Sequence, residues 1–89
     1  MIKTQITIIN KLGLHARAAA KLSSCAARFS SDIKIHVADK QADCKSVMSL
    51  MLLAASQGTE VEFEIDGRDE TRANESLCEL VNDYFGEGE

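Results

Sequence analysis

The sequence predicts an α+β fold in which three helices cover one face of a sheet and leave the other face open. Residues 60–66 alternate strictly between acidic and apolar side chains, which is typical of a strand with one buried side. Residues 16–28, and a last segment from 69 or 70 to 86, carry apolar side chains at helical spacing. Because such strands and helices bury their apolar sides against each other, we expect one domain over residues 1–89 with the order β-α-β-β-α-β-α.

The composition is typical of a small globular domain. Of the 89 residues, 45% are hydrophobic and none is proline, so neither a disordered chain nor a proline-rich linker is expected. The N-terminus lacks a continuous apolar run and no segment reaches membrane-spanning length, so we expect a cytoplasmic protein without membrane insertion. Cys25, Cys44 and Cys78 are odd in number and widely spaced, which predicts free, mostly buried thiols and no metal site.

Charge is distributed unevenly along the chain. Residues 1–45 contain eight Lys or Arg and three Asp or Glu, whereas residues 46–89 contain two and eleven, and the net charge is −4. An acidic chain with few aromatic side chains is a poor candidate for nucleic-acid binding, so we expect no nucleic-acid partner. A local basic face could still attract acidic protein partners.

The chain begins with a predicted strand and a predicted helix. Residues 2–9 predict the first strand. Its two sides would carry Ile2, Thr4, Ile6 and Ile8, and Lys3, Gln5 and Thr7, and Ile9 breaks the alternation near the end. Gly13 would interrupt the structure that precedes the helix. The helix over 16–28 is rich in alanine, the residue with the highest helix propensity.

A strand hairpin is predicted next. The second strand runs over 33–37, where Ile33, Ile35 and Val37 alternate with polar residues. A turn at 38–41 and a weak strand at 41–44 would complete the hairpin. His36 lies on the polar side of the second strand, where we expect an exposed residue without a chemical role.

Ser46 is predicted to cap a short helix that begins at Val47 and ends near Gly58, because a serine hydroxyl can accept a hydrogen bond from the first helical turn. This helix is too apolar for a single buried stripe. The residues expected to face the core are Leu50, Leu53 and Ala54, and those expected to stay partly exposed are Val47, Met48 and Met51. A Met-rich exposed surface is adaptable contact area, although a fully buried helix fits the periodicity equally well.

The last strand and the last helix follow directly. The strand over 60–66 places Val61, Phe63 and Ile65 inward and a uniformly acidic face outward. Gly67 ends this strand, and Asp69 or Glu70 begins a helix that ends at Gly86. The expected apolar stripe of this helix consists of Ala73, Leu77, Leu80 and Tyr84.

His15 lies at the predicted start of the first helix. The first backbone N–H groups of a helix have no partner inside it and carry the positive end of its dipole, so they bind anions, phosphate above all. Arg17 adds a guanidinium that can hold phosphate oxygens. We expect a neutral His15 ring with one nitrogen free as a nucleophile, which suggests phosphoryl transfer through His15 itself. Alternatively, His15 is only a poor helix cap and Arg17 a solvated charge.

A polar row continues from His15 along the outer side of the first helix, at spacings of four, three and four: Arg17, Lys21, Ser24 and Arg28. The spacing alone fits a solvated face as well as a docking surface. The direct continuation from His15 favours a docking surface.

The segment Asn10-Lys11-Leu12-Gly13-Leu14-His15-Ala16-Arg17 resembles the active-site segment of the HPr family, the histidine phosphocarriers of the bacterial phosphoenolpyruvate phosphotransferase system. The chain length and the order of elements are also similar to this family. The resemblance implies an open-faced β-sandwich, with a four-stranded antiparallel sheet covered on one face by three helices.

The resemblance also implies a function. In HPr proteins the active-site histidine, here His15, accepts a phosphoryl group on Nδ1 from the phosphohistidine of enzyme I, which phosphoenolpyruvate charges. It then passes the group to an enzyme IIA domain, in sugar uptake or its regulation. The backbone N–H groups of Ala16 and Arg17 and the Arg17 guanidinium would hold the phosphate, with no metal, no cofactor and no turnover of a small substrate. The short helix after Ser46 is part of the partner-binding surface in this family.

Two positions qualify the resemblance: one differs from many HPr sequences, and the other resembles a regulatory site of the family. Many HPr sequences have proline where this chain has Ala18, and proline is tolerated but not required in a first helical turn. Lys45-Ser46 resembles the regulatory phosphorylation site of HPr proteins, which would make HPr kinase/phosphorylase a further partner. A helix cap alone also explains Ser46.

Three hypotheses about function share this architecture. The first is a phosphocarrier of sugar uptake, the second a carrier in a nitrogen-related or purely regulatory branch, and the third a non-catalytic binding module. Intact His15 and Arg17 argue against the third. We expect a monomer.

Overall fold

Four antiparallel strands form one sheet in the order β1-β4-β2-β3. The computed structural model describes residues 1–89. Its strands are β1 (Ile2–Thr7), β2 (Asp32–Val37), β3 (Lys40–Asp43) and β4 (Glu60–Asp66). The predicted hairpin is confirmed, because β2 and β3 pair from Lys34 with Asp43 to Val37 with Lys40. The first strand is shorter than predicted, although Ile8 still accepts a hydrogen bond from Gly58 N–H (2.7 Å) beyond its end.

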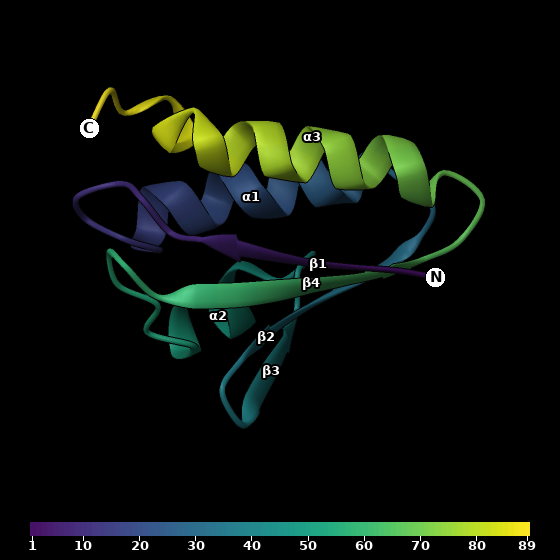
Figure 1. Ribbon diagram of the computed structural model, residues 1–89, viewed down its shortest axis with the longest axis horizontal. Coiled ribbons are helices and arrows are strands. Elements are labelled where there is room, and N and C mark those ends of the chain that lie inside the picture. Colours follow the sequence, from purple (N-terminus) through teal and green to yellow (C-terminus); the bar gives the residue numbers. More distant parts are fainter.

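Three helices complete the predicted α+β order. They are α1 (Ala16–Ala27), α2 (Val47–Leu52) and α3 (Glu70–Asn82), and a short 3-10 turn, η1 (Tyr84–Gly86), follows α3. Figure 1 shows α1 and α3 side by side over β1 and β4, while α2 contacts α1 and β3. Neither these helices nor η1 has the length and apolar character needed to cross a membrane.

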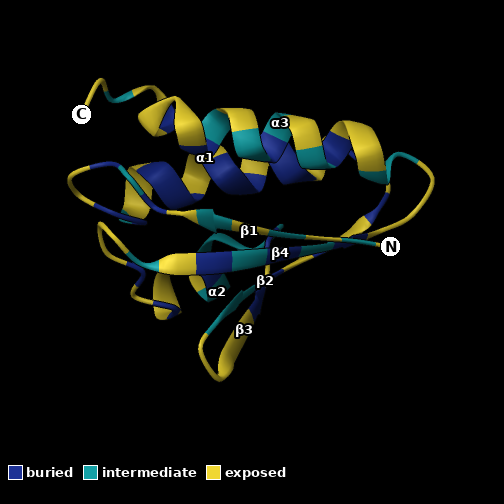
Figure 2. Ribbon diagram, in the orientation of Figure 1, coloured by how far each residue is buried: buried dark blue, intermediate teal, exposed yellow.

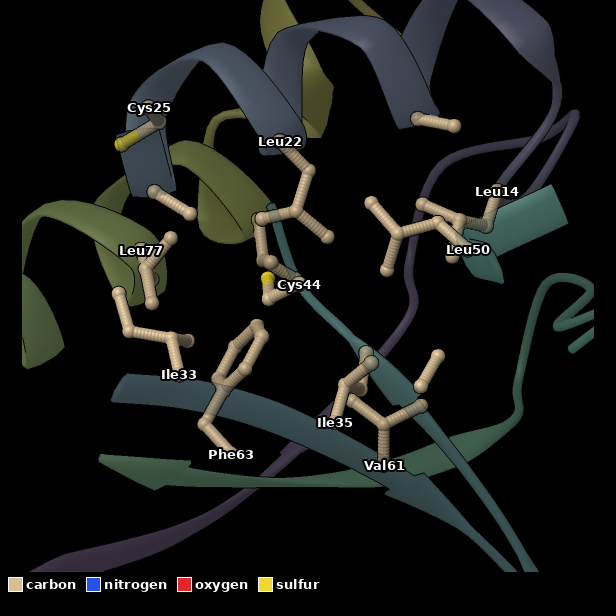
Figure 3. Close-up of a cluster of buried hydrophobic side chains, with 14 of the residues drawn as sticks. Leu14, Leu22, Cys25, Ile33, Ile35, Cys44, Leu50, Val61, Phe63 and Leu77 are labelled. Atoms are coloured by element: carbon tan, nitrogen blue, oxygen red, sulfur yellow. The ribbon is translucent and has the colours of Figure 1, made fainter. Parts of the chain in front are cut away.

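One hydrophobic core of 22 buried residues lies between the helices and the sheet. Figure 3 shows Leu22 and Leu50 pointing toward Phe63 and Ile35 of the sheet. As predicted, Val61, Phe63 and Ile65 point inward, and each is at most 1% exposed. The sides of α1 and α3 that face the sheet are buried, and their outer sides are exposed (Figure 2).

The other face of the sheet is polar, as predicted. It pairs Lys3 and Lys34 with Glu64 on the neighbouring strands. The expectation for His36 is wrong in part, because its side chain is only 27% exposed and its Nε2 lies 3.2 Å from Glu64 Oε1. A sheet brings diagonal neighbours on adjacent strands within reach, and this contact is not visible from the second strand alone.

Two helix ends differ from the prediction. The helix α2 ends at Leu52 rather than near Gly58, and Ala54 is exposed with a left-handed φ of 53°, so that Ala55 is buried in its place. The helix α3 ends at Asn82 rather than Gly86. Tyr84 is therefore 38% exposed and Phe85 is fully buried, with left-handed φ values at both residues. Helical periodicity predicts the wrong inward residue wherever the chain has already left the helix.

Candidate functional site

His15 is the N-cap of α1, as predicted. Its backbone is extended (φ −77°, ψ −180°), and its carbonyl oxygen accepts the hydrogen bond of Ala19 N–H (2.8 Å). The His15 side chain makes no capping hydrogen bond. The N–H groups of the first turn of α1, including those of Ala16 and Arg17, are therefore not occupied by the cap and can receive an anion.

The loop before His15 is held tightly. Leu14 is buried, and its N–H donates to the carbonyl oxygen of Ala55 (2.8 Å). Gly13 has a left-handed φ of 67°, and a Cβ atom there would lie 2.6 Å from the same Ala55 oxygen. Only glycine fits both the conformation and the close approach, which explains the residue at this position and fixes where α1 begins.

Arg17 is exposed on the first turn of α1. It lines the same surface hollow as His15, together with Lys11, Lys21 and the C-terminal segment, and the volume of this hollow is about 580 Å³. The structure thus places the imidazole, the guanidinium and the free end of α1 around one space. This arrangement can bind a phosphate-sized anion next to a histidine.

Glu87 is a site residue that the sequence analysis missed. One oxygen of its carboxylate, Oε2, contacts His15 Nε2, and the other, Oε1, accepts a hydrogen bond from Asn10 Nδ2 (2.9 Å). The Glu87 side chain is only 10% exposed. Burial raises the pKa of this carboxyl, but the hydrogen bonds from Asn10 and His15 outweigh burial and lower the pKa below its ordinary value. No pattern in the sequence joins residues that are 72 positions apart.

The predicted basic row on α1 is present, but it faces acidic side chains. Arg17, Lys21, Ser24 and Arg28 are exposed and line a groove of about 840 Å³ between α1 and α3. The α3 side of this groove carries Glu79 and Asp83. Two of the cations are also engaged within the chain. Lys21 Nζ donates to Phe85 O (2.7 Å), and the Arg28 guanidinium lies 5.6 Å from the centre of the Phe29 ring.

Exposed apolar side chains gather on α2. As predicted, Met48, Met51 and Val47 are all at least partly exposed. Met48 and Met51 are 71% and 42% exposed, and Val47 is half-buried against the core. Leu52 is 76% exposed and Leu12, in the loop before His15, is 67% exposed, and the sequence analysis named neither. A helix of only six residues cannot bury all of its apolar side chains on one side.

Ser46 caps α2 as predicted. Its hydroxyl accepts a hydrogen bond from Ser49 N–H (3.3 Å), and the residue is half-buried. The preceding residue attaches this cap to α1, because Ser23 Oγ donates to Lys45 O (3.0 Å). Ser46 therefore lies at the end of α2 that is tied to the middle of α1.

The three cysteines are free, as predicted, with Cys25 and Cys44 buried. Burial raises the pKa of the Cys44 thiol to about 12. No group of three or more His, Cys, Asp or Glu side chains is arranged to hold a metal ion.

A family model described as the PTS HPr component phosphorylation site matches residues 2–83. Phosphocarrier protein HPr of Neisseria meningitidis serogroup A is 51% identical to this chain over 89 residues, which is the full length of both proteins. The chain belongs to the HPr family. HPr proteins are phosphocarriers of the phosphotransferase system, so this chain is a phosphocarrier with partners in that system.

Further relatives within the family agree with this result. The crystal structure of an HPr from Thermoanaerobacter tengcongensis is 41% identical, covers 98% of both chains and superposes with a TM-score of 0.94. A structure described as an HPr dimer from the same organism covers 98% of this chain and 100% of its own, with 41% identity and a TM-score of 0.79. Phosphocarrier protein NPr of Shewanella violacea is 40% identical and covers 97% of this chain and 94% of its own length.

Proposed function

We propose that His15 accepts a phosphoryl group from the phosphohistidine of enzyme I, which phosphoenolpyruvate charges, and passes it to a histidine of an enzyme IIA domain. The observation that carries this proposal is the His15 ring at the open N-terminus of α1. Glu87 contacts its Nε2, no protein group hydrogen-bonds its Nδ1, and Arg17 lines the same hollow. A nucleophilic nitrogen beside an anion-binding helix end is the arrangement that phosphoryl transfer requires.

The transfer needs no cofactor in this mechanism. The His15 Nδ1 lone pair forms the new N–P bond, and the donor nitrogen keeps the electron pair of the P–N bond that breaks. The N–H groups of Ala16 and Arg17 and the Arg17 guanidinium stabilise the charge on the phosphoryl oxygens. Ala18, where many HPr sequences have proline, packs into the core with 0% exposure and keeps a backbone N–H that proline lacks.

The surface around His15 supports docking of enzyme I and enzyme IIA domains. It combines the cations of α1 with exposed apolar side chains, and acidic partners of both kinds could use it. The proposed contact residues are Arg17, Lys21, Ser24, Arg28, Val47, Met48 and Met51. We add Leu12 and Leu52 because their side chains are exposed.

Ser46 is a candidate for regulatory phosphorylation by HPr kinase/phosphorylase. It lies at the start of α2, next to the proposed contact residues Val47 and Met48. A phosphate there would gain from the dipole of α2 and would place negative charge at the edge of a docking surface for acidic partners. Incubation with that kinase and ATP, comparing wild type with Ser46→Ala, tests this role.

The carrier function is tested with purified enzyme I and phosphoenolpyruvate. A mass increase of one phosphoryl group that is stable at alkaline pH and lost at acid pH is expected, and it should be absent from His15→Ala. Phosphorylated protein should then lose the group to an enzyme IIA domain. A protein that gains no mass under these conditions is an inert binding module rather than a carrier.

A nitrogen-related or purely regulatory branch is a second candidate. The NPr of Shewanella violacea, at 40% identity over nearly the full length of both chains, supports keeping this alternative. The two branches differ in the acceptor. Mixing the phosphorylated protein with enzyme IIA domains of sugar permeases and of the nitrogen-related branch, and measuring which discharges it faster, distinguishes them.

We expect the protein to act as a monomer in the cytoplasm. Its three free cysteines fit a reducing compartment. Because a structure described as an HPr dimer is also similar to this chain, light scattering during gel filtration at several concentrations is needed to test the monomer.

A further inference from the structure

We propose that Glu87 is a positioning residue for phosphoryl transfer, which holds the His15 ring with Nε2 protonated and Nδ1 unprotonated toward the phosphoryl donor. This inference rests on the proposed function of His15. It adds a residue that lies outside the span of the family match, which ends at residue 83.

Both carboxylate oxygens of Glu87 contact other side chains of the protein. Oε2 contacts His15 Nε2 and Oε1 accepts from Asn10 Nδ2, so the carboxylate cannot rotate without breaking one of the two contacts. Asn10 is fully buried and its second Nδ2 proton goes to Gly13 O (2.8 Å). The amide of Asn10 therefore links the loop that precedes His15 to the carboxylate that contacts the ring.

The chain after α3 is anchored so that Glu87 reaches His15. Phe85 is 0% exposed in the core, and its carbonyl oxygen accepts from Lys21 Nζ (2.7 Å). Lys11 N–H donates to Glu89 O (3.1 Å) on the other side of Glu87. Tyr84, Phe85 and Gly86 all have left-handed φ values, which reverse the chain direction after α3. A glutamate between two glycines in a terminal segment would otherwise be solvated and mobile.

The carboxylate determines which ring nitrogen can react. An ionised carboxylate only accepts hydrogen bonds, so the His15 nitrogen that faces it must carry the proton. The lone pair is then on Nδ1. When Nδ1 bonds to phosphorus, the P–N bond of the phosphohistidine donor breaks with its electron pair on the donor, and His15 becomes positively charged with its Nε2 proton still in place. Glu87 stabilises that charge, and no proton has to move.

The same carboxylate also brings negative charge toward a phosphoryl group. The repulsion is limited because the Glu87 carboxylate contacts Nε2 and not Nδ1, the nitrogen that is phosphorylated. If repulsion were nevertheless the stronger effect, Glu87 would slow the reaction. The direction of the rate change on removing its charge therefore separates a positioning residue from an inhibitory one.

Glu87→Gln is the most informative variant because Asn10 orients the new amide. Asn10 Nδ2 donates toward residue 87, so the glutamine must turn its oxygen to Asn10 and its NH₂ group to His15. An NH₂ group facing Nε2 requires Nε2 to be unprotonated and moves the proton to Nδ1, the nucleophile. Glu87→Ala removes the contact without imposing the wrong tautomer and should be less impaired.

Nitrogen-15 NMR of the His15 ring tests this inference directly, at mildly alkaline pH and without any partner protein. The wild type should be mainly protonated at Nε2, Glu87→Gln mainly at Nδ1, and Glu87→Ala mixed. Glu89→Gln, which makes the same charge change in the same segment, is the matched control and should resemble the wild type. A Glu87→Gln ring that keeps the wild-type tautomer would overturn the inference.

Single-turnover phosphorylation by enzyme I supplies the second measurement. Glu87→Gln should accept the phosphoryl group roughly 10- to 100-fold more slowly, the loss typical when the hydrogen-bond partner of a metal-ligating histidine is mutated, and Glu87→Ala less so. Equal or faster acceptance by Glu87→Gln contradicts a positioning role. Failure of the wild type to be phosphorylated would instead contradict the proposed function, and the NMR result would still decide the role of Glu87.

Discussion

The molecule contains two histidine–glutamate pairs, and only one of them lies at a site suited to phosphoryl transfer. In both pairs Nε2 contacts a glutamate, His15 with Glu87 and His36 with Glu64, and both histidine side chains are 27% exposed. Their surroundings differ. His15 lies at the end of α1 beside unpaired N–H groups and Arg17, whereas His36 lies on a strand whose register pairs it with Glu62 and Gln41.

From this difference we infer that a histidine held by a carboxylate is not sufficient for phosphoryl transfer. A phosphoryl group needs donors for its oxygens, and the N-terminus of a helix supplies them while the ladder of a sheet has already used its own. The polar face of the sheet near His36 also carries Glu60, Glu62 and Glu64, which would repel a phosphoryl group. The position of the pair in the fold, and not the pair itself, decides its use.

The largest expected effect comes from removing each histidine in turn. His15→Ala should abolish labelling by phosphoenolpyruvate and enzyme I, because it removes the only nucleophile at the helix end. His36→Ala should label like the wild type. Radioactive transfer or intact mass measures both variants, and label that persists in His15→Ala would reverse the assignment.

Removing the cation beside each histidine sharpens the comparison. Arg17→Ala removes a charge-assisted contact worth roughly 1.5–3 kcal/mol if fully engaged, which corresponds to a rate of transfer lower by about tenfold or more. Thermal stability should barely change, because Arg17 is exposed. Lys34→Ala, the matched change on the strand of His36, should leave transfer unaffected. Stopped-flow or quenched-flow kinetics compare the two, and equal losses would show a general charge effect.

A smaller effect is expected from negative charge at Ser46. Ser46→Asp should slow acceptance from enzyme I several-fold at low ionic strength by weakening association with an acidic partner, and added salt should partly restore the rate. The fold should be unchanged or slightly more stable, since the residue caps α2 and an anion there suits the helix dipole. Indistinguishable rates at low salt would mean that Ser46 is only a cap.

The smallest expected effect on transfer, and a clear effect on stability, belongs to Asp69, the N-cap of α3, whose side chain contacts the segment after α1. Its carboxylate accepts from Ser31 Oγ (2.5 Å), Ser30 N–H (2.9 Å) and Ser31 N–H (3.0 Å), and these bonds lower its pKa from 3.8 to about 2. Because the pKa is lower in the folded state, this carboxylate contributes its full stability above pH 3.8 and loses the contribution as the pH falls toward 2.

Acid unfolding followed by circular dichroism checks this expectation. Asp69→Asn should be less stable than the wild type at neutral pH and should lose less of its stability between about pH 4 and pH 2, by the linkage above. Its rate of phosphorylation at neutral pH should equal that of the wild type. A parallel loss of stability with pH in both proteins would show that these hydrogen bonds do not determine acid sensitivity.

The sequence by itself determined the features that depend on near neighbours. Strict alternation identified β4, alanine and an apolar period identified α1, and these patterns arise within a few residues. The two helix starts were also predictable. The start of α1 followed from Gly13 and the alanine-rich run after His15, and the start of α2 from a serine hydroxyl that accepts from an N–H three positions on. The resemblance to HPr proteins added the roles that we expect of the residues around His15.

Only the tertiary structure decided the contacts between distant parts of the chain. Glu87 reaches His15 because the chain reverses after α3 and Phe85, rather than Tyr84, enters the core. The exposure of Leu52 likewise depends on where α2 ends, and the pairing of His36 with Glu64 depends on the order of the strands. Such contacts follow from the packing of the whole core, and no pattern of neighbouring residues records them.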